Sequence, residues 1–157
     1  MDVRLETLEA FDIITSFAIG PYPTSAPQAW EQLFTWLGKQ NEVQPKQLIG
    51  FGMDDPFCTP EHLIRYVAGA SFEGNAKNSP EDKIHLMQIK GGIYGIYTMK
   101  GPYHNMPQAF AKLKNEWLPS TDHQVDVSRP WLEVYLNDPS KVSEDEYLTD
   151  LHLPLLS

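Results

Sequence analysis

The chain has 157 residues, of which 41% are hydrophobic and 11% aromatic, and its formal net charge at pH 7 is −9. This composition predicts one folded domain, excludes a disordered chain and, through its acidity, disfavours direct binding of DNA or RNA. No apolar run approaches the length that spans a bilayer, and no secretory leader is evident. The single cysteine, Cys58, excludes an internal disulfide, so we expect a soluble cytoplasmic protein.

The first expected elements are a strand over residues 11–19 and the helix that follows it. The strand ends at Gly20-Pro21, because proline cannot donate to a strand ladder. Pro27 fits the first turn of the helix, where the missing N–H costs nothing. Four apolar residues with the spacing i, i+3, i+4, i+7 predict the buried stripe of this helix: Trp30, Leu33, Phe34 and Leu37.

Two further strands are predicted over residues 47–53 and 63–72, followed by a polar linker over residues 73–83. The same order then returns, with a strand over residues 93–99, a helix, and strands over residues 131–136 and 147–153. The stripe predicted for the second helix consists of Met106, Phe110, Leu113 and Trp117.

The second half of the chain repeats the turn and helix-start motifs of the first half. Gly-Pro-Tyr occurs at residues 20–22 and 101–103, and Pro-Gln-Ala-aromatic occurs at residues 27–30 and 107–110. Asp54-Asp55-Pro56 in the first half matches Asn137-Asp138-Pro139 in the second. We interpret this as a duplication within a single domain of residues 1–157, with repeats over about residues 3–73 and 84–155.

A strand-helix-strand-strand unit that occurs twice predicts the fold class. We expect an α+β fold with an eight-stranded, mainly antiparallel sheet and two long helices on one side of it. A pseudo-twofold axis should relate the two halves. A central cleft at this axis, where the halves meet, is the natural place for a ligand.

One carboxylate interrupts an apolar strand in the segment RPWLEVYLNDP. Alternation places Glu133 on one face with Trp131 and Tyr135, and puts Leu132, Val134 and Leu136 on the other. In one interpretation Glu133 is a partly buried group that pairs with a cationic ligand or acts as a base. In the other it is a hydrogen-bonded part of the core, and the residues alone leave both open.

Several aromatic residues are candidates for the walls of such a site. Trp131 and Tyr135 could stack on a flat ligand or lie against a cation, or they could be ordinary core. Tyr66 is their candidate partner in the first half. Trp36 lies one position off the predicted helix stripe, so we expect it to border a groove. For Tyr22 and Tyr103, which follow the Gly-Pro turns, we expect packing roles.

Other chemistry has little support in the sequence. The five histidines have no paired spacing that would favour a metal site. Neither a P-loop nor a Gly-x-Gly-x-x-Gly motif is present, so no nucleotide cofactor is expected. No motif indicates a catalytic nucleophile. The acidic segment 143–150 is interpreted as a solvated loop, with a surface for a basic protein partner as the alternative.

The duplicated unit, both Gly-Pro-Tyr turns and the segments IGFGMDDP, IKGGIYGIYTMKGPY and PWLEVYLNDP together resemble the GyrI-like small-molecule-binding family. The resemblance covers roughly residues 3–154. This family also supplies effector-binding domains to AraC-type and MerR-type transcription regulators. The resemblance implies a drug- or metabolite-binding cleft lined by aromatic residues, with the Glu of the Glu-x-Tyr strand, here Glu133, at its base.

The chain begins almost directly at the first strand, so the resemblance implies a stand-alone member that does not itself read DNA. Three functions are open. The favoured one is capture of bulky aromatic, cationic compounds, without catalytic residues, cofactor or metal. The alternatives are a protein-binding regulator like the DNA gyrase inhibitors, and a hydrolase of reactive electrophilic toxins. The ligand-binding residues expected for the favoured function are Glu133, Trp131, Tyr135, Tyr66 and Trp36.

Overall fold

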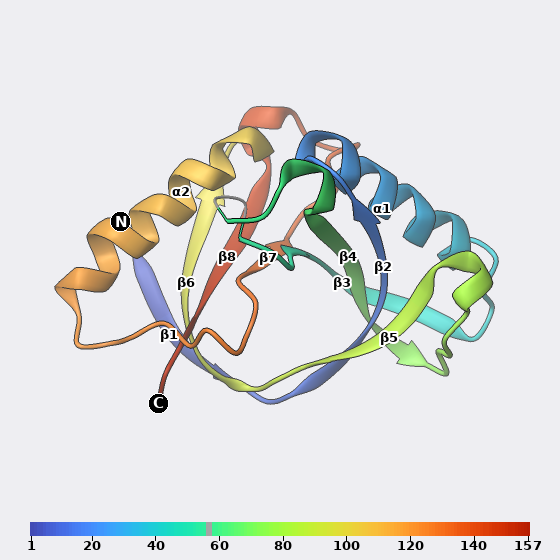
Figure 1. Ribbon diagram of the computed structural model, residues 1–157, viewed down its shortest axis with the longest axis horizontal. Coiled ribbons are helices and arrows are strands. Elements are labelled where there is room, and N and C mark those ends of the chain that lie inside the picture. Colours follow the sequence, from blue (N-terminus) through green and yellow to red (C-terminus); the bar gives the residue numbers. More distant parts are fainter. Residues whose placement is uncertain (56–57) are drawn as a thin grey trace. The chain divides into compact units, whose positions relative to one another are not determined.

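The computed structural model describes residues 1–55 and 58–157, so Pro56 of the Asp54-Asp55-Pro56 motif lies outside the described residues. The fold class is α+β, as expected. The described residues form eight strands, which are antiparallel wherever they pair, and two main helices (Figure 1). The chain divides into two compact units. Unit 1 comprises Met1–Ala10 and Lys90–Ser157, and unit 2 comprises Phe11–Ile89.

Unit 2 contains a four-stranded antiparallel sheet in the order β3-β4-β2-β5, and the helix α1 packs across β2 and β4 (Figure 1). The Gly-Pro turn ends the second strand where the sequence predicts, because Gly20 has a φ of 132° that favours glycine. The elements of unit 2 are β2 (Phe11–Ile19), α1 (Tyr22–Leu37), β3 (Val43–Gly52), β4 (Arg65–Gly74) and β5 (Ile84–Ile89).

The buried face of α1 differs from the predicted stripe. Phe34 was expected to be buried but is 48% exposed, whereas Trp36 is only 7% exposed. The residues that α1 buries are Ser25, Ala29, Leu33 and Trp36. The strands beneath the helix carry small residues such as Ala18, Ala68 and Ala70, which belong to the same core. A helix face with small residues in its first turns and Trp36 in its last turn fits this surface better than the predicted stripe.

Unit 1 contains a second four-stranded antiparallel sheet, in the order β1-β6-β8-β7. Its helical run covers one face of this sheet and shares a core with β6 and β8. The elements of unit 1 are β1 (Val3–Leu8), β6 (Gly92–Lys100), α2 (Met106–Lys112), β7 (Leu132–Tyr135) and β8 (Leu148–Leu155).

The helical run of unit 1 is not a regular α-helix throughout. The α-helical part ends at Lys112, and Leu113–Trp117 forms a π turn before a 3-10 turn over Leu118–Ser120. Leu113 and Trp117 are four residues apart, whereas the matching Leu33 and Trp36 are three apart. The π turn accommodates this extra residue, so that Trp117 still packs against the sheet, where Gly95 leaves room for its ring.

Two of the eight strands have no counterpart among the six that the sequence motifs predict. These are β1, which pairs with β6, and β5, which pairs with β2. The first strand of the chain therefore completes unit 1, which is otherwise built from the second half. The compact units and the sequence repeats thus differ by one strand each. The pseudo-twofold axis and the cleft along it stay predictions.

In the described part of the chain, no helix is long and apolar enough to cross a membrane.

Candidate ligand-binding site

Glu133 lies in the middle of β7, on the face that alternation predicts. Leu132 and Val134 are buried at 0% and 5% exposure, whereas Glu133 and Tyr135 are half-buried. The two faces of the strand therefore differ in burial, although both are largely removed from water. The carboxylate belongs to the face on which Trp131 is also half-buried.

The strand register shows what surrounds this face. Glu133 lies opposite Leu151 of β8, which in turn lies opposite Tyr97 of β6. Directly opposed residues of an antiparallel sheet point to the same side. Leu151 packs with Leu113 of the helical run, so Glu133 shares the helix-covered face of unit 1.

Aromatic groups flank the carboxylate on the same strand. The hydroxyl of Tyr135 donates a hydrogen bond to Oε1 of Glu133 over 3.3 Å. The indole of Trp131 packs against Phe110 of α2, with the ring centroids 5.6 Å apart. The strand thus places the carboxylate of Glu133 between two aromatic side chains. Tyr135 donates a hydrogen bond to it, and Trp131 packs against the helix α2.

Two more tyrosines join Tyr135. Tyr103 meets Tyr135 edge-on with centroids 5.3 Å apart, and it stacks on Tyr147 with centroids 4.6 Å apart. We name Tyr103, Tyr135 and Tyr147 the tyrosine cluster. Sequence reasoning gave Tyr103 a packing role and missed Tyr147, which precedes β8 and contacts the cluster only through the fold.

Within the tyrosine cluster, the phenol of Tyr103 has a shifted pKa. Burial raises the pKa of Tyr103 above its usual value of 10.0, and the nearby Tyr147 and Asp138 raise it further. Tyr103 therefore stays a neutral hydroxyl beside Tyr135. Glu133 is the acidic side chain of the site, and the rings around it supply polarisable faces and hydroxyl groups.

Tyr66 lies in the core of unit 2, where it is 5% exposed. Its hydroxyl accepts a hydrogen bond from Nε1 of Trp30 over 3.1 Å, and its ring meets Tyr22 edge-on at 6.0 Å. Tyr22 in turn donates to the carbonyl oxygen of Asp54. Tyr66, which the sequence suggested as a polar partner of the site, is therefore bonded within unit 2 to Trp30 of α1.

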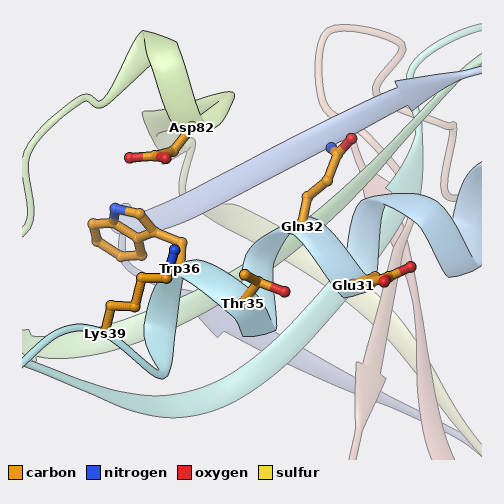
Figure 2. A pocket seen from close by; sticks show the side chains of 6 residues that line it. All are labelled: Glu31, Gln32, Thr35, Trp36, Lys39 and Asp82. Carbon is orange, nitrogen blue, oxygen red and sulfur yellow. The ribbon is translucent and has the colours of Figure 1, made fainter.

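Trp36 also lies in the core of unit 2, but one side of it lines a shallow pocket of about 250 Å³. Figure 2 shows side chains from α1 along one side of this pocket and Asp82 across from Trp36. The other lining residues are Glu31, Gln32, Thr35 and Lys39. Gln32 is tied to Ser16 and to the carbonyl of Phe17. Five of the six residues that line this pocket are polar or charged, in contrast to the aromatic surroundings of Glu133.

The turns after β3 and β7 hold these strand ends in place by different bonds. In unit 2 the carboxylate of Asp54 accepts hydrogen bonds from Nε and Nη2 of Arg65 at 3.0 and 2.9 Å. This contact with Arg65 lowers the pKa of Asp54. In unit 1 the amide of Asn137 bridges the backbone of Glu146 and Leu148. Tyr66 and Tyr135 therefore lie close to strand ends that hydrogen bonds hold in place.

Of the five predicted site residues, the structure brings Trp131, Glu133 and Tyr135 together on one face of unit 1. Tyr66 and Trp36 belong to the core of unit 2. Within residues 1–55 and 58–157, no group of three or more histidine, cysteine or acidic side chains could hold a metal ion. A carboxylate among ring faces is suited to an organic cation.

The chain has clear relatives. It is 27% identical over 161 residues to the DNA gyrase inhibitor of Citrobacter koseri, a match that covers 100% of this chain and 99% of that protein. Its fold matches the crystal structure of the EcmrR C-terminal domain with a TM-score of 0.78 at 14% identity, covering 99% of this chain and 98% of that one. It also matches the structure of SAV2435 bound to tetraphenylphosphonium, with a TM-score of 0.64 at 14% identity, over 100% and 95% of the two chains.

The family model of the GyrI-like small molecule binding domain matches residues 1–156, which is nearly the whole chain. The chain therefore belongs to the GyrI-like small-molecule-binding family.

Proposed function

We propose that the protein captures bulky aromatic cations, with Glu133 as the counter-charge and the rings of Trp131 and Tyr135 as walls. The observation that carries the proposal is the half-buried carboxylate of Glu133 beneath the hydroxyl of Tyr135. A carboxylate that is partly removed from water gains more from an organic cation than an exposed one does. Aromatic faces add attraction for the same cation.

The surroundings of Glu133 favour a large, weakly hydrated cation over a small metal ion. Rings replace the oxygen ligands that a hard metal ion requires. A phosphonium or quaternary ammonium compound loses little hydration when it leaves water, and its aryl groups can pack on Trp131. The structural likeness to SAV2435, whose solved structure contains tetraphenylphosphonium, supports this class of ligand.

Titration with tetraphenylphosphonium tests the proposal, because Trp131 should report binding through its fluorescence. The wild-type protein should show saturable quenching, and Glu133→Gln should weaken binding by about tenfold or more through loss of the charge pair. Glu61→Gln, which removes an exposed carboxylate in unit 2, is the matched control and should bind like wild type. Equal affinity of all three proteins would overturn the role of Glu133.

A second function is favoured by the full-length similarity to the Citrobacter koseri DNA gyrase inhibitor. In this alternative the protein binds a basic surface of a partner through the exposed acidic turn Glu144–Glu146. Neutralising Glu144, Asp145 and Glu146 together should then abolish retention of DNA gyrase in a pull-down, while Glu133→Gln should leave it unchanged. The reverse pattern would speak against this function.

A further inference from the structure

The hydroxyl of Thr149 is a buried polar group that the proposed function does not yet use. Thr149 is 0% exposed, and its Oγ1 has no hydrogen-bond partner within the described parts of the chain. Folded proteins leave few buried hydroxyls unpaired, because each one loses its bonds to water without replacement. This position therefore requires a physical explanation.

Thr149 lies beneath the tyrosine cluster on the face that carries Glu133. In the ladder between β7 and β8 it lies directly opposite Tyr135, the residue whose hydroxyl donates to Glu133. Tyr147 precedes it by two residues and stacks on Tyr103. The direct cross-strand neighbours of Thr149 on this face are therefore Tyr135 of β7 and Met99 of β6, and Met99 has no side-chain group that donates a hydrogen bond.

Unit 2 shows how the same position is satisfied in the other copy. The counterpart of Thr149 is Tyr66, because each lies ten residues after the Pro of its Asp-Pro motif. In unit 2 the ring of Tyr66 reaches toward α1, and Nε1 of Trp30 donates to its hydroxyl over 3.1 Å. A bond between helix and strand thus closes this position.

Unit 1 has neither the donor nor the acceptor of that hydrogen bond. The counterpart of Trp30 in the repeated Pro-Gln-Ala-aromatic motif is Phe110, which has no N–H to donate and packs against Trp131. Thr149 is shorter than Tyr66 by a phenol ring and cannot span the same distance. The hydroxyl is thus left at the base of the site without a partner from the helix.

We infer that the hydroxyl of Thr149 is a hydrogen-bonding subsite for the ligand held at Glu133, and that it favours aromatic cations carrying a hydroxyl group close to the charge. This inference rests on the proposed function. A cation that pairs with Glu133 competes with the hydroxyl of Tyr135 for the carboxylate. Displacement of Tyr135 opens the position next to Thr149, because the two residues are direct cross-strand neighbours. The charge and the hydroxyl of a single ligand can then replace both contacts.

A matched pair of cations isolates the contribution of Thr149. Ethyltriphenylphosphonium and 2-hydroxyethyltriphenylphosphonium differ by one hydroxyl group, and calorimetric titration at pH 7 measures both affinities. Wild type should bind the hydroxyethyl compound about 3- to 10-fold more tightly, the size of one neutral hydrogen bond. Thr149→Val, which keeps the shape, should lose this preference, whereas Thr149→Ser should retain it.

Thr35→Val is the matched control, because Thr35 is exposed on α1 in unit 2, and it should keep the wild-type preference. A preference that persists in Thr149→Val, or equal binding of both compounds by wild type, would overturn the inference while the proposed function stands. If neither compound binds wild type, the proposed function and this inference both fail. Circular dichroism establishes that each variant folds, and Thr149→Ala, which also removes the hydroxyl and should lose the preference, carries the test if Thr149→Val does not fold.

Discussion

Units 1 and 2 place a tyrosine on opposite strands of the same cross-strand pair. In unit 2 Gly52 of β3 faces Tyr66 of β4, and in unit 1 Tyr135 of β7 faces Thr149 of β8. The space over Gly52 is taken by Tyr22, since a Cβ at Gly52 would collide with the hydroxyl group of Tyr22. The same pair of backbone positions thus supports two different arrangements of rings.

The charge is present in one unit only. Two residues before Gly52 and Tyr135 stand Gly50 and Glu133, so the position of the acid is occupied by glycine in unit 2. Unit 2 fills its helix-covered face with Tyr22, Trp30 and Tyr66, which bond to one another or to backbone. A duplicated scaffold can thus keep its backbone and its helix contacts while a carboxylate stands among the rings of one copy only.

The largest effect on stability should come from two buried leucines at equivalent positions of the two helical segments. Leu33 and Leu113 occupy equivalent positions and are both 0% exposed. Leu33→Ala and Leu113→Ala should each lower the free energy of unfolding by about 2–5 kcal/mol, because each leaves a cavity. Urea denaturation measures both, and Phe34→Ala, at an exposed position of α1, should cost far less. A small loss in only one of the leucine variants would show that the two cores are not equivalent.

A smaller effect should separate the units by pH. On the sheet face opposite Glu133, unit 1 carries Asp150 and His152 where unit 2 has Val67 and Gly69. Asp150 accepts hydrogen bonds from Arg4 and from Thr98 at 2.6 and 2.5 Å. The imidazole of His152 lies edge-on to Tyr94 at 5.4 Å and has a buried Nδ1 without a partner among the described residues.

Burial lowers the pKa of His152 from 6.5, the effect of Arg4 adds to this, and Asp150 and Glu6 oppose it. The unfolded chain therefore binds a proton that the folded chain resists, so stability should fall as the pH drops below about 6.5. The slope from this group is at most about 1.4 kcal/mol per pH unit. Urea denaturation between pH 5 and 8 should show that His152→Leu removes this component. A wild-type slope that survives the substitution would assign the acid sensitivity to other groups.

The smallest effect should distinguish the two strand-end turns. Arg65 pairs with Asp54 at a site where the side chains are 43% and 18% exposed. Arg65→Gln should therefore cost no more than about 1 kcal/mol, and less in high salt, because solvent screens the pair. Asn137→Ala removes neutral hydrogen bonds in the matching turn of unit 1, so its cost should not depend on salt. Melting temperatures in low and high salt measure both, and equal salt dependence would contradict this distinction.

The sequence predicts most of the fold because the residues that end strands and begin helices form short local motifs. The Gly-Pro turns and the repeated motifs place six strands within a few residues of their observed ends. Periodicity could not choose the buried face of α1, because Phe34 and Trp36 are both large and apolar, and only the alanines of the facing strands decide between them. The strands β1 and β5 lack such motifs, so their pairing appears only in the fold.

The candidate site was predicted as far as one strand reaches. Trp131, Glu133 and Tyr135 follow from alternation alone, and the structure places them on one face. Tyr103 and Tyr147 join them through contacts between residues far apart in the chain, which no local pattern reveals. The unpaired hydroxyl of Thr149 is found only in the structure, and comparison with the bonded Tyr66 of unit 2 shows which contact is missing.

The pairing of β1 with β6 also orders events during synthesis. Unit 2 is a continuous segment, Phe11–Ile89, so all of its strands have emerged before most of unit 1 has been made. The first strand of the chain must wait for Tyr97 of β6, the partner of Val3, before its ladder can be completed. Unit 2 can thus fold first on the ribosome, and the N-terminal strand remains an unpaired tether until the second copy arrives.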